Sequence, residues 1–216
     1  VMSLFQDTSA LGITPDDLVN CQLGALGIPE FGTDFAMQMV IDAKPKAFSD
    51  LVRISGLSHG TNVWLGNAQD LIMSGVATIS TAICTRDDIM LYLIQMGVES
   101  EKSFKIMEAV RKGKVKKGGF QDGWVEAMQE HDVPEWYIES LAKIGYLFPK
   151  AHAVAYVMMA FRIAWFKVHE PLAFYATFFT VRAKAFDAEY CCAGLDAVKR
   201  KIREIENNKD ASAVEQ

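Results

Sequence analysis

Cysteine and histidine are scarce in this sequence, and those present form no metal or catalytic pattern. The 216 residues include four cysteines and four histidines, with no CxxC pair and no HExxH motif. So few cysteines exclude a disulfide-stapled scaffold and argue against a structural zinc. Glycine patterns of phosphate-binding or dinucleotide-binding loops are also missing. We therefore predict no catalytic residue, no metal ligand, and reduced thiols in a cytoplasmic protein.

Adjacent carboxylates are equally rare, and their positions have a simple structural explanation. The two neighbouring acid pairs, Asp16-Asp17 and Asp87-Asp88, lie where helices are expected to begin. Acids at a helix start stabilise the helix dipole, and we favour this explanation. Metal-assisted phosphoryl transfer would instead need carboxylates that converge on a cation. The residues alone favour a domain that binds anionic ligands over a self-sufficient enzyme.

The sequence also lacks long uncharged apolar runs and an excess of basic residues. Lys150, Arg162 and Lys167 interrupt the longest apolar run, so we expect no membrane span and no membrane partner. The formal net charge of −5 argues against a generally basic nucleic-acid binder. No segment alternates with a period of two, which indicates a mostly α fold. The first residue is Val rather than Met, and this suggests a piece of a longer chain.

The most informative segment is a long apolar stretch with a basic start. Residues 150–168 contain no Gly or Pro, and Pro171 follows, so they predict one long helix, buried among other helices. Lys150 and His152 lie in its first turn, where free N–H groups and the dipole attract anions. This combination indicates a phosphate site. The alternative, a core helix with a basic first turn, is equally consistent with this stretch.

Two further segments have the composition of functional loops. Residues 53–67 carry glycines and small polar side chains, which suits a loop that approaches a ligand, although a plain helix connector explains them better. Residues 111–119 are dense in lysine and glycine and could clamp a nucleic-acid backbone through phosphates. A solvated loop that only complements the preceding helix dipole explains them equally well.

The remaining elements are expected to be helices separated by short connections. Thr33 is expected to cap a helix at residues 34–42, Ser49 the next one, and Thr85 a helix at residues 86–96. Residues 171–179 are aromatic and are expected to be buried. A last helix is expected at residues 187–207, and the polar tail 207–216 is expected to fray.

Several motifs of this sequence resemble one protein family. They are FPKAHAVAY at residues 148–156, followed by Arg162, FKVH at 166–169 and Pro171. Others are LGIPEFGT at 26–33, RISGLSHGT at 53–61, RDDIM at 86–90, HDVPEWYI at 131–138 and FTVRA at 179–183. Together they resemble the fingers of bacterial C-family replicative DNA polymerases, the α subunits of DNA polymerase III, in the PolC-type form of low-GC Gram-positive bacteria. The resemblance spans residues 1–206, which we take as one fingers domain.

The resemblance implies roles for individual residues. Lys150 and His152 would face the triphosphate of an incoming deoxynucleotide, and residues 53–61 would line the nascent base pair. The implied dNTP and base-pair contacts are Lys150, His152, Arg53, Ser58, His59, Arg86 and Arg162. Tyr156 would stack near the base or belong to the core. The DNA-backbone candidates are Lys112, Lys114, Lys116 and Lys117, although residues 114–122 depart from the family's shorter link.

The same resemblance implies what lies outside this chain. Three palm aspartates would hold Mg²⁺ upstream of Val1, so no metal ligand is expected here and the fragment should be inactive alone. Implied partners are dNTP, primer–template DNA, the other polymerase domains and the replisome with its sliding clamp. The competing interpretation is a helical protein-interaction module without a nucleotide role.

Overall fold

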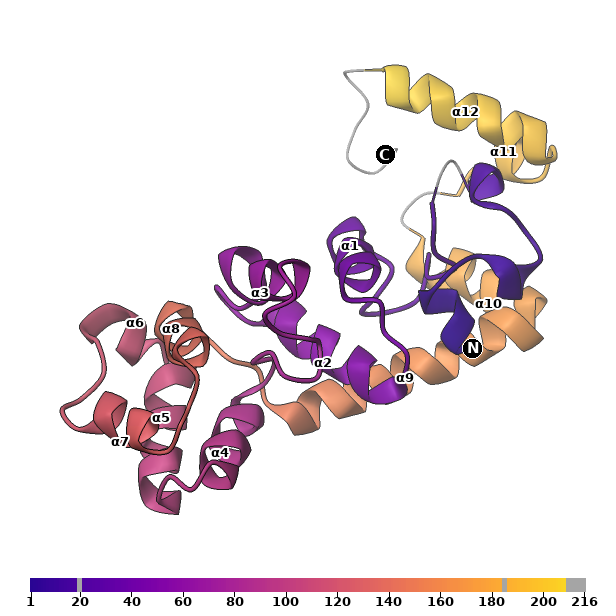
Figure 1. The fold of residues 1–216 in the computed structure, drawn as a ribbon. Helices are drawn as coiled ribbons and strands as arrows, with labels where there is room; N and C mark the ends of the chain where they lie inside the picture. The colour runs from indigo at the N-terminus through magenta and orange to yellow at the C-terminus, as the bar shows by residue number, and fades with distance from the viewer. Residues whose placement is uncertain (19–20, 184–185, 209–216) are drawn as a thin grey trace.

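The computed structural model describes residues 1–18, 21–183 and 186–208, and in these ranges the fold is helical (Figure 1). No strand occurs among them, and the one isolated bridge pairs Thr61 with Tyr146. The mostly α prediction is thus confirmed. The helices are α1 (Asp34–Ala43), α2 (Phe48–His59), α3 (Gln69–Met73), α4 (Arg86–Gln95), α5 (Ser100–Arg111), α6 (Lys114–Gly118), α7 (Trp124–Glu130), α8 (Glu135–Lys143), α9 (Lys150–His169), α10 (Pro171–Thr177), α11 (Ala188–Cys191) and α12 (Leu195–Asn207). Short turns precede or join them at Met2–Phe5, Ser9–Leu11, Pro15–Leu18, Trp64–Ala68 and Phe178–Arg182.

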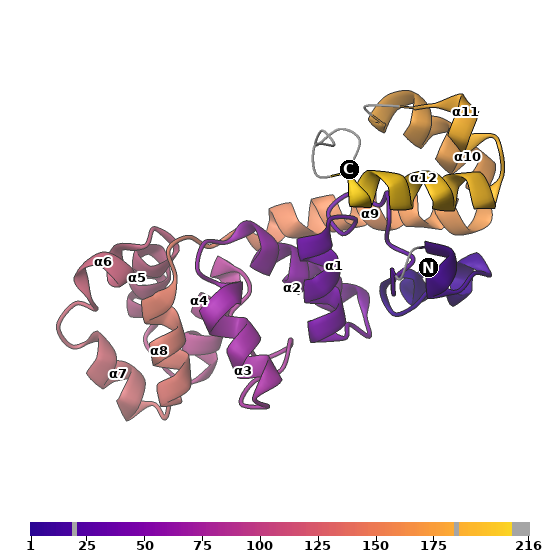
Figure 2. The ribbon, with the colours of Figure 1, turned by 90° about the horizontal axis from the view of Figure 1, so that it is seen from above.

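The described chain is elongated, and α9 is its longest element. Figures 1 and 2 show α4 to α8 gathered at one end, beyond the start of α9. Helices α1 to α3 lie beside the middle of the molecule, and α10, α12 and the N-terminal turns lie at the other end. The start of α9 therefore lies where the α4–α8 end meets the rest.

Helix α9 packs along one face only. Its buried side chains include Ala153, Val157, Ala160 and Ala164, spaced so that they form one stripe on the helix. Small alanines let α2 approach closely along this stripe. The helix has the predicted bounds, and the side chains of this stripe are buried as predicted. On its other faces, however, Tyr156 and Phe166 are 45% and 48% exposed. A dry core on all sides of α9 is therefore not found.

Length and composition would let α9 cross a membrane, and within the described residues it is the one helix that passes this test. A single such helix is weak evidence, because the core helix of a soluble protein passes the same test. The buried stripe against α2, and the Lys167 ammonium bonded to backbone carbonyls of Gly24 and Leu26, fit a helix packed within protein.

The local helix signals were partly right. Thr33 caps α1 by accepting a hydrogen bond from Ala36 N, and α4 begins directly after Thr85. The assignment of Ser49 as a cap is wrong, because α2 already begins at Phe48. There the Asp50 carboxylate accepts hydrogen bonds from Lys46 N and Ala47 N at 2.9 and 3.1 Å, replacing a hydroxyl cap.

Two expected loops are helical in the structure. Arg53, Ser58 and His59 belong to α2, so the loop prediction for residues 53–59 is wrong. Gly56 lies inside this helix, where only a glycine fits. A Cβ at this position would stand 2.7 Å from Cys84 O and from a Thr85 methyl group. The basic segment also forms a helical turn, α6, after Gly113. Glycine at these places serves close packing rather than an open loop.

The C-terminal third departs from expectation in exposure and continuity. Leu172 is 88% exposed, and of residues 171–179 only Phe174 is fully buried, so the prediction of burial there is wrong. The last helix is split at residues 192–194 into α11 and α12, because Gly194 adopts a left-handed φ of 95°. The predicted tail at 209–216 lies outside the described residues.

Candidate functional site

The start of α9 meets the start of α4, and one carboxylate joins them. The Lys150 backbone N–H donates to Asp87 Oδ2 at 2.8 Å, and Arg86 N donates to Phe148 O at 3.2 Å. Both helix starts carry unsatisfied N–H groups and partial positive charge, so their meeting would be repulsive without an anion between them. Asp87 is that anion. The helix-start explanation of the acid pair thus extends to a second helix.

Asp88 fixes the Lys150 side chain while it caps its own helix. Its Oδ2 accepts hydrogen bonds from Thr85 N at 2.8 Å and Cys84 N at 3.2 Å, and its Oδ1 lies 3.6 Å from Lys150 Nζ. The Lys150 side chain is 40% exposed, so its ammonium faces solvent on one side and a carboxylate on the other. A phosphate that binds here would compete with Asp88 for the same ammonium.

Phe148 lies two residues before Lys150, and its ring contacts the rings of both His59 and His152. The His59 ring stacks on Phe148 with centroids 4.8 Å apart, and His152 lies edge-on at 5.9 Å. The structure therefore brings together the histidines of α2 and α9, which are far apart in sequence. Ser58 joins this group, since its hydroxyl lies 3.0 Å from His59 Nδ1.

Both nitrogens of His59 face hydrogen-bond acceptors. Nδ1 lies 2.8 Å from Ser55 O, and Nε2 lies 3.2 Å from Glu30 Oε2. The tautomer of the ring decides which of its two nitrogens donates. Glu30 reaches this position from a backbone with φ of 71°, a left-handed conformation that is uncommon outside glycine. The pair places a second carboxylate beside a candidate anion-binding cation.

The three predicted arginines lie in different places. Arg53 is paired with Asp50 at 3.5 Å on α2. Arg86 contributes its backbone N–H to the junction of α4 and α9. Arg162 is exposed on α9, twelve residues or about 18 Å beyond Lys150 at the rise of an α-helix. Arg86 thus belongs to the junction, Arg53 lies on α2 with its own carboxylate, and Arg162 lies apart from the junction.

The charges around the junction act on one buried thiol. Burial raises the pKa of Cys84 well above its usual value, and Asp88 raises it further. The positive charges of Arg53 and Lys150 oppose that rise. Both cations therefore lie within electrostatic reach of the Cys84 sulfur. Cys84 itself is enclosed and is therefore an inert packing residue.

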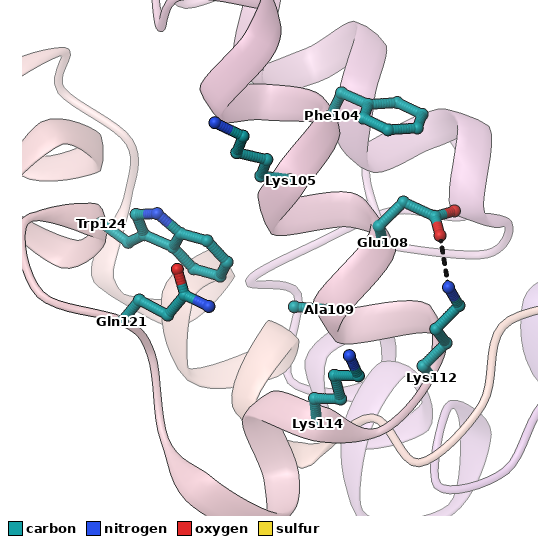
Figure 3. Close-up of a pocket in the computed structure, with 8 residues that line it drawn as sticks. All are labelled: Phe104, Lys105, Glu108, Ala109, Lys112, Lys114, Gln121 and Trp124. Atoms are coloured by element: carbon teal, nitrogen blue, oxygen red, sulfur yellow. Dashed lines mark ion pairs between the residues drawn. The ribbon is translucent and has the colours of Figure 1, made fainter.

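The basic segment lines a cavity of about 360 Å³ at the α4–α8 end (Figure 3). Lys112 and Lys114 lie on its rim, and Lys112 pairs with Glu108 at 2.9 Å. Hydrogen bonds from Arg111 and Lys112 lower the pKa of Glu108 to about 2. Lys116 instead turns to Asn62 Oδ1, and Lys117 stays exposed outside the cavity. Only half of the predicted DNA-backbone lysines therefore share one site.

A second, larger cavity of about 790 Å³ lies along the far half of α9. Met159, Ile163 and Phe166 form one wall, and Phe174 and Phe178 form another. Lys167 shapes it from beneath by donating to Gly24 O and Leu26 O at 2.7 and 2.6 Å, which fixes the loop that borders the groove. We call this cavity the apolar groove.

Sequence reasoning named none of the acids as partners of the predicted cations, and it did not include Phe148 among the predicted contacts. Asp87 and Lys150 are 63 residues apart, and no local pattern connects them. Within the described residues, no three His, Cys, Asp or Glu side chains gather as metal ligands would. The family resemblance assigns Mg²⁺ to residues elsewhere, and this assignment stays a prediction.

Comparison with known proteins identifies the class of protein to which this fold and junction belong. Residues 1–132 match the family model described as the bacterial DNA polymerase III alpha subunit finger domain. The chain belongs to this family, as its motifs predicted. The match ends before α9, so the cluster around Lys150 is covered by the full-length relatives alone.

The relatives narrow the family to its PolC-type members. The DNA polymerase III PolC-type of Lactococcus lactis subsp. lactis (strain IL1403) is 57% identical over 218 residues, which cover 100% of this chain and 13% of the relative. That of Oceanobacillus iheyensis is 54% identical over 216 residues, covering 100% of this chain and 15% of the relative. That of Caldanaerobacter subterraneus subsp. tengcongensis is 58% identical over 205 residues, which cover 95% of this chain and 14% of the relative. The chain thus spans about one seventh of these curated relatives.

Proposed function

We propose that this chain is the part of a PolC-type DNA polymerase that binds the incoming deoxynucleoside triphosphate and the nascent base pair during DNA replication. The observation that carries the proposal is the cluster of Lys150, His152 and His59 at the meeting point of two helix starts. Cations and free N–H groups together suit a polyphosphate. The family membership supplies the polymerase context.

In this proposal the residues of the chain bind and orient rather than break bonds. Lys150 and His152 neutralise triphosphate oxygens and the charge that builds up as pyrophosphate leaves. Phe148 and His59 form the wall against which the nascent pair rests. Closure of the domain positions the α-phosphate for in-line attack by the primer 3′-hydroxyl. In the whole enzyme, residues outside this chain would hold Mg²⁺, and the bound ion would neutralise part of the triphosphate charge.

A nucleotide titration of the chain followed by NMR tests this proposal. We expect Mg²⁺-dependent shifts at the amides of Phe148 and of residues 150–153, and we expect Lys150→Ala to abolish them. Arg203→Ala is the matched control, because Arg203 is an exposed helical cation at the far end of the molecule. Shifts that survive in Lys150→Ala, or that are lost equally in Arg203→Ala, would overturn the assignment.

The isolated chain is proposed to be inactive, because the bond-making groups belong to the rest of the polymerase. Purified protein incubated with primed template, Mg²⁺ and all four nucleotides should give no extended primer. Extension above the level of a Lys150→Ala sample would contradict this. In the cell, the proposed partners are primer–template DNA, the other polymerase domains and the replisome with its sliding clamp, in the cytoplasm and without a membrane.

The competing function is a helical interaction module, and the apolar groove is the observation that favours it. In that case Lys150 and His152 are ordinary surface charges. Nucleotide should then fail to protect Lys150 from amine-reactive labelling, even in a longer polymerase that contains the palm. Protection of Lys150 by nucleotide in that longer protein, with Lys102 as an unprotected reference, would exclude this alternative.

A further inference from the structure

The cavity at the α4–α8 end has one aromatic wall and a basic rim. Trp124 is nearly buried and turns its indole to the cavity beside Gln121, as Figure 3 shows. Lys105 on α5 and Lys114 on α6 also line the cavity, and the Lys105 amine pairs with Glu101 one turn earlier on α5. Phe104, which is 50% exposed, adds a second ring to the lining. A flat apolar face and amines thus occur side by side.

The rim keeps an excess of positive charge. Three lysines and a single carboxylate, Glu108, line the cavity. Glu108 is already shared between Arg111 and Lys112, and Lys105 pairs with Glu101 at 2.6 Å. The Lys114 ammonium forms no hydrogen bond and no ion pair with another residue that the structure describes. It is therefore the cation most available to a ligand.

We propose that this cavity binds one unpaired nucleotide of a single DNA strand, with the base against the aromatic wall and the phosphate at Lys114. A base can reach an aromatic face only when it is unstacked, because neighbouring bases cover both of its faces in a duplex. The amines then bind the backbone phosphates that flank the base. The Gln121 amide offers a donor and an acceptor to a base edge.

The cavity is joined directly to the junction of α4 and α9. Leu147 N donates to Arg111 O at 3.3 Å, so the end of α5 is bonded to the strand-like segment that leads into α9. Gly113 approaches Gly145 so closely that a Cβ there would lie 2.4 Å from Gly145 O. The end of the cavity at Lys112 and Lys114 is therefore connected through the backbone to the segment that leads to Lys150. Resting on that proposed function, we assign the strand as unpaired template.

Binding of a fluorescent dT octamer to the chain at low salt, followed by anisotropy, tests this inference. Lys114→Ala should weaken binding about 3- to 10-fold and reduce the slope of log affinity against log salt by about one. Lys102→Ala should change the affinity less than about twofold. Lys102 belongs to α5, the helix that also carries Lys105, but it does not line the cavity.

A base-free octamer separates stacking from simple charge attraction. Wild-type protein should prefer dT over the abasic strand by about fivefold or more, the value expected from about 1 kcal/mol of stacking on an aromatic ring. Phe104→Ala should reduce that preference. Because the Phe104 ring is half-exposed, its removal should leave the fold intact. Trp124 is not substituted because it is buried in the wall.

Three results would overturn the inference. They are equal binding of dT and abasic strands, equal loss in Lys114→Ala and Lys102→Ala, and tighter binding of a duplex or of a poly-glutamate peptide than of the octamer. NMR locates the response: octamer shifts belong at residues 104–124, whereas nucleotide shifts belong at residues 148–153. Failure of one proposal is therefore visible without failure of the other.

Discussion

At the scale of single residues, the candidate cations are held by acids before any ligand arrives. Lys150 faces Asp88, His59 faces Glu30, and Arg53 faces Asp50. A binding site built this way keeps its side chains in place, but a polyanion must displace the resident carboxylates. In the proposed function, the triphosphate therefore competes with these carboxylates for the same cations.

Removing one resident charge should strengthen nucleotide binding. Asp88→Asn keeps an oxygen for the Thr85 and Cys84 N–H groups but frees Lys150. A partly exposed ion pair is worth up to about 1 kcal/mol, so triphosphate affinity should rise by up to about fivefold. The NMR titration measures this, with Asp70→Asn, another first-turn acid, as control. An unchanged or weaker affinity in Asp88→Asn would show that Asp88 does not compete.

Lys167 should make stability depend on pH. Burial lowers the pKa of Lys167 from 10.5 to about 8, so between these values the unfolded chain binds the proton more tightly. The contribution of Lys167 to the free energy of unfolding therefore rises as the pH increases from about 8 towards 10.5. Relative to Lys167→Met, wild-type stability should grow by about 1–2 kcal/mol between pH 7 and pH 9.5.

Urea unfolding at the two pH values measures this difference. Lys167→Met should also be less stable than wild type at both, because Gly24 O and Leu26 O lose their donor, at a cost of about 1–3 kcal/mol for a buried unpaired acceptor. A stability difference that stays constant or shrinks towards pH 9.5 would mean that the lysine titrates normally.

At the scale of elements, the approach of α2 to α4 depends on a missing side chain. Gly56→Ala places a Cβ 2.7 Å from Cys84 O and from Thr85 Cγ2, so one helix must move. Overpacking of this kind destabilises by about 1–3 kcal/mol. Gly118→Ala in α6 meets nothing within 4 Å and should be neutral or slightly stabilising. Chemical denaturation compares the two, and equal stability would refute the close-packing role of Gly56.

The same glycine shows how far the sequence could predict the fold. Thr33, Thr85 and Pro171 are local signals, and the helix bounds they indicate were correct. Gly56 looked like a loop residue because its reason, a neighbour 28 residues away, is invisible locally. The Asp87 contact with Lys150 spans 63 residues and was missed for the same reason. Long-range packing, rather than local propensity, assembles this site.

At the scale of the molecule, the apolar groove is an open cavity of about 790 Å³ along the far half of α9. Met159, Ile163 and Phe166 face it from α9, and the relatives are about seven times longer than this chain. A surface of this kind attracts hydrophobic ligands and dyes. The isolated chain is therefore expected to enhance the fluorescence of an anilinonaphthalene dye.

A pair of neighbouring aromatic residues tests where the dye sits. Phe166→Ser should lower the dye signal strongly while costing about 1 kcal/mol or less, because the ring is half-exposed. Trp165→Ser is the matched control, since Trp165 is equally exposed but does not line the groove. Equal losses in the two variants, or no dye signal in wild type, would contradict a groove-bound dye.

Helix α9 has a mechanical consequence because its two ends carry different sites. Its 20 residues form a rod about 30 Å long without an internal glycine or proline. Tilting that rod by about 5° at Lys150 sweeps its far end through about 2.6 Å. A displacement that size is comparable to half a turn of helix. In the proposed function, a small adjustment of the backbone around a bound phosphate would therefore be transmitted along α9 to the wall of the groove.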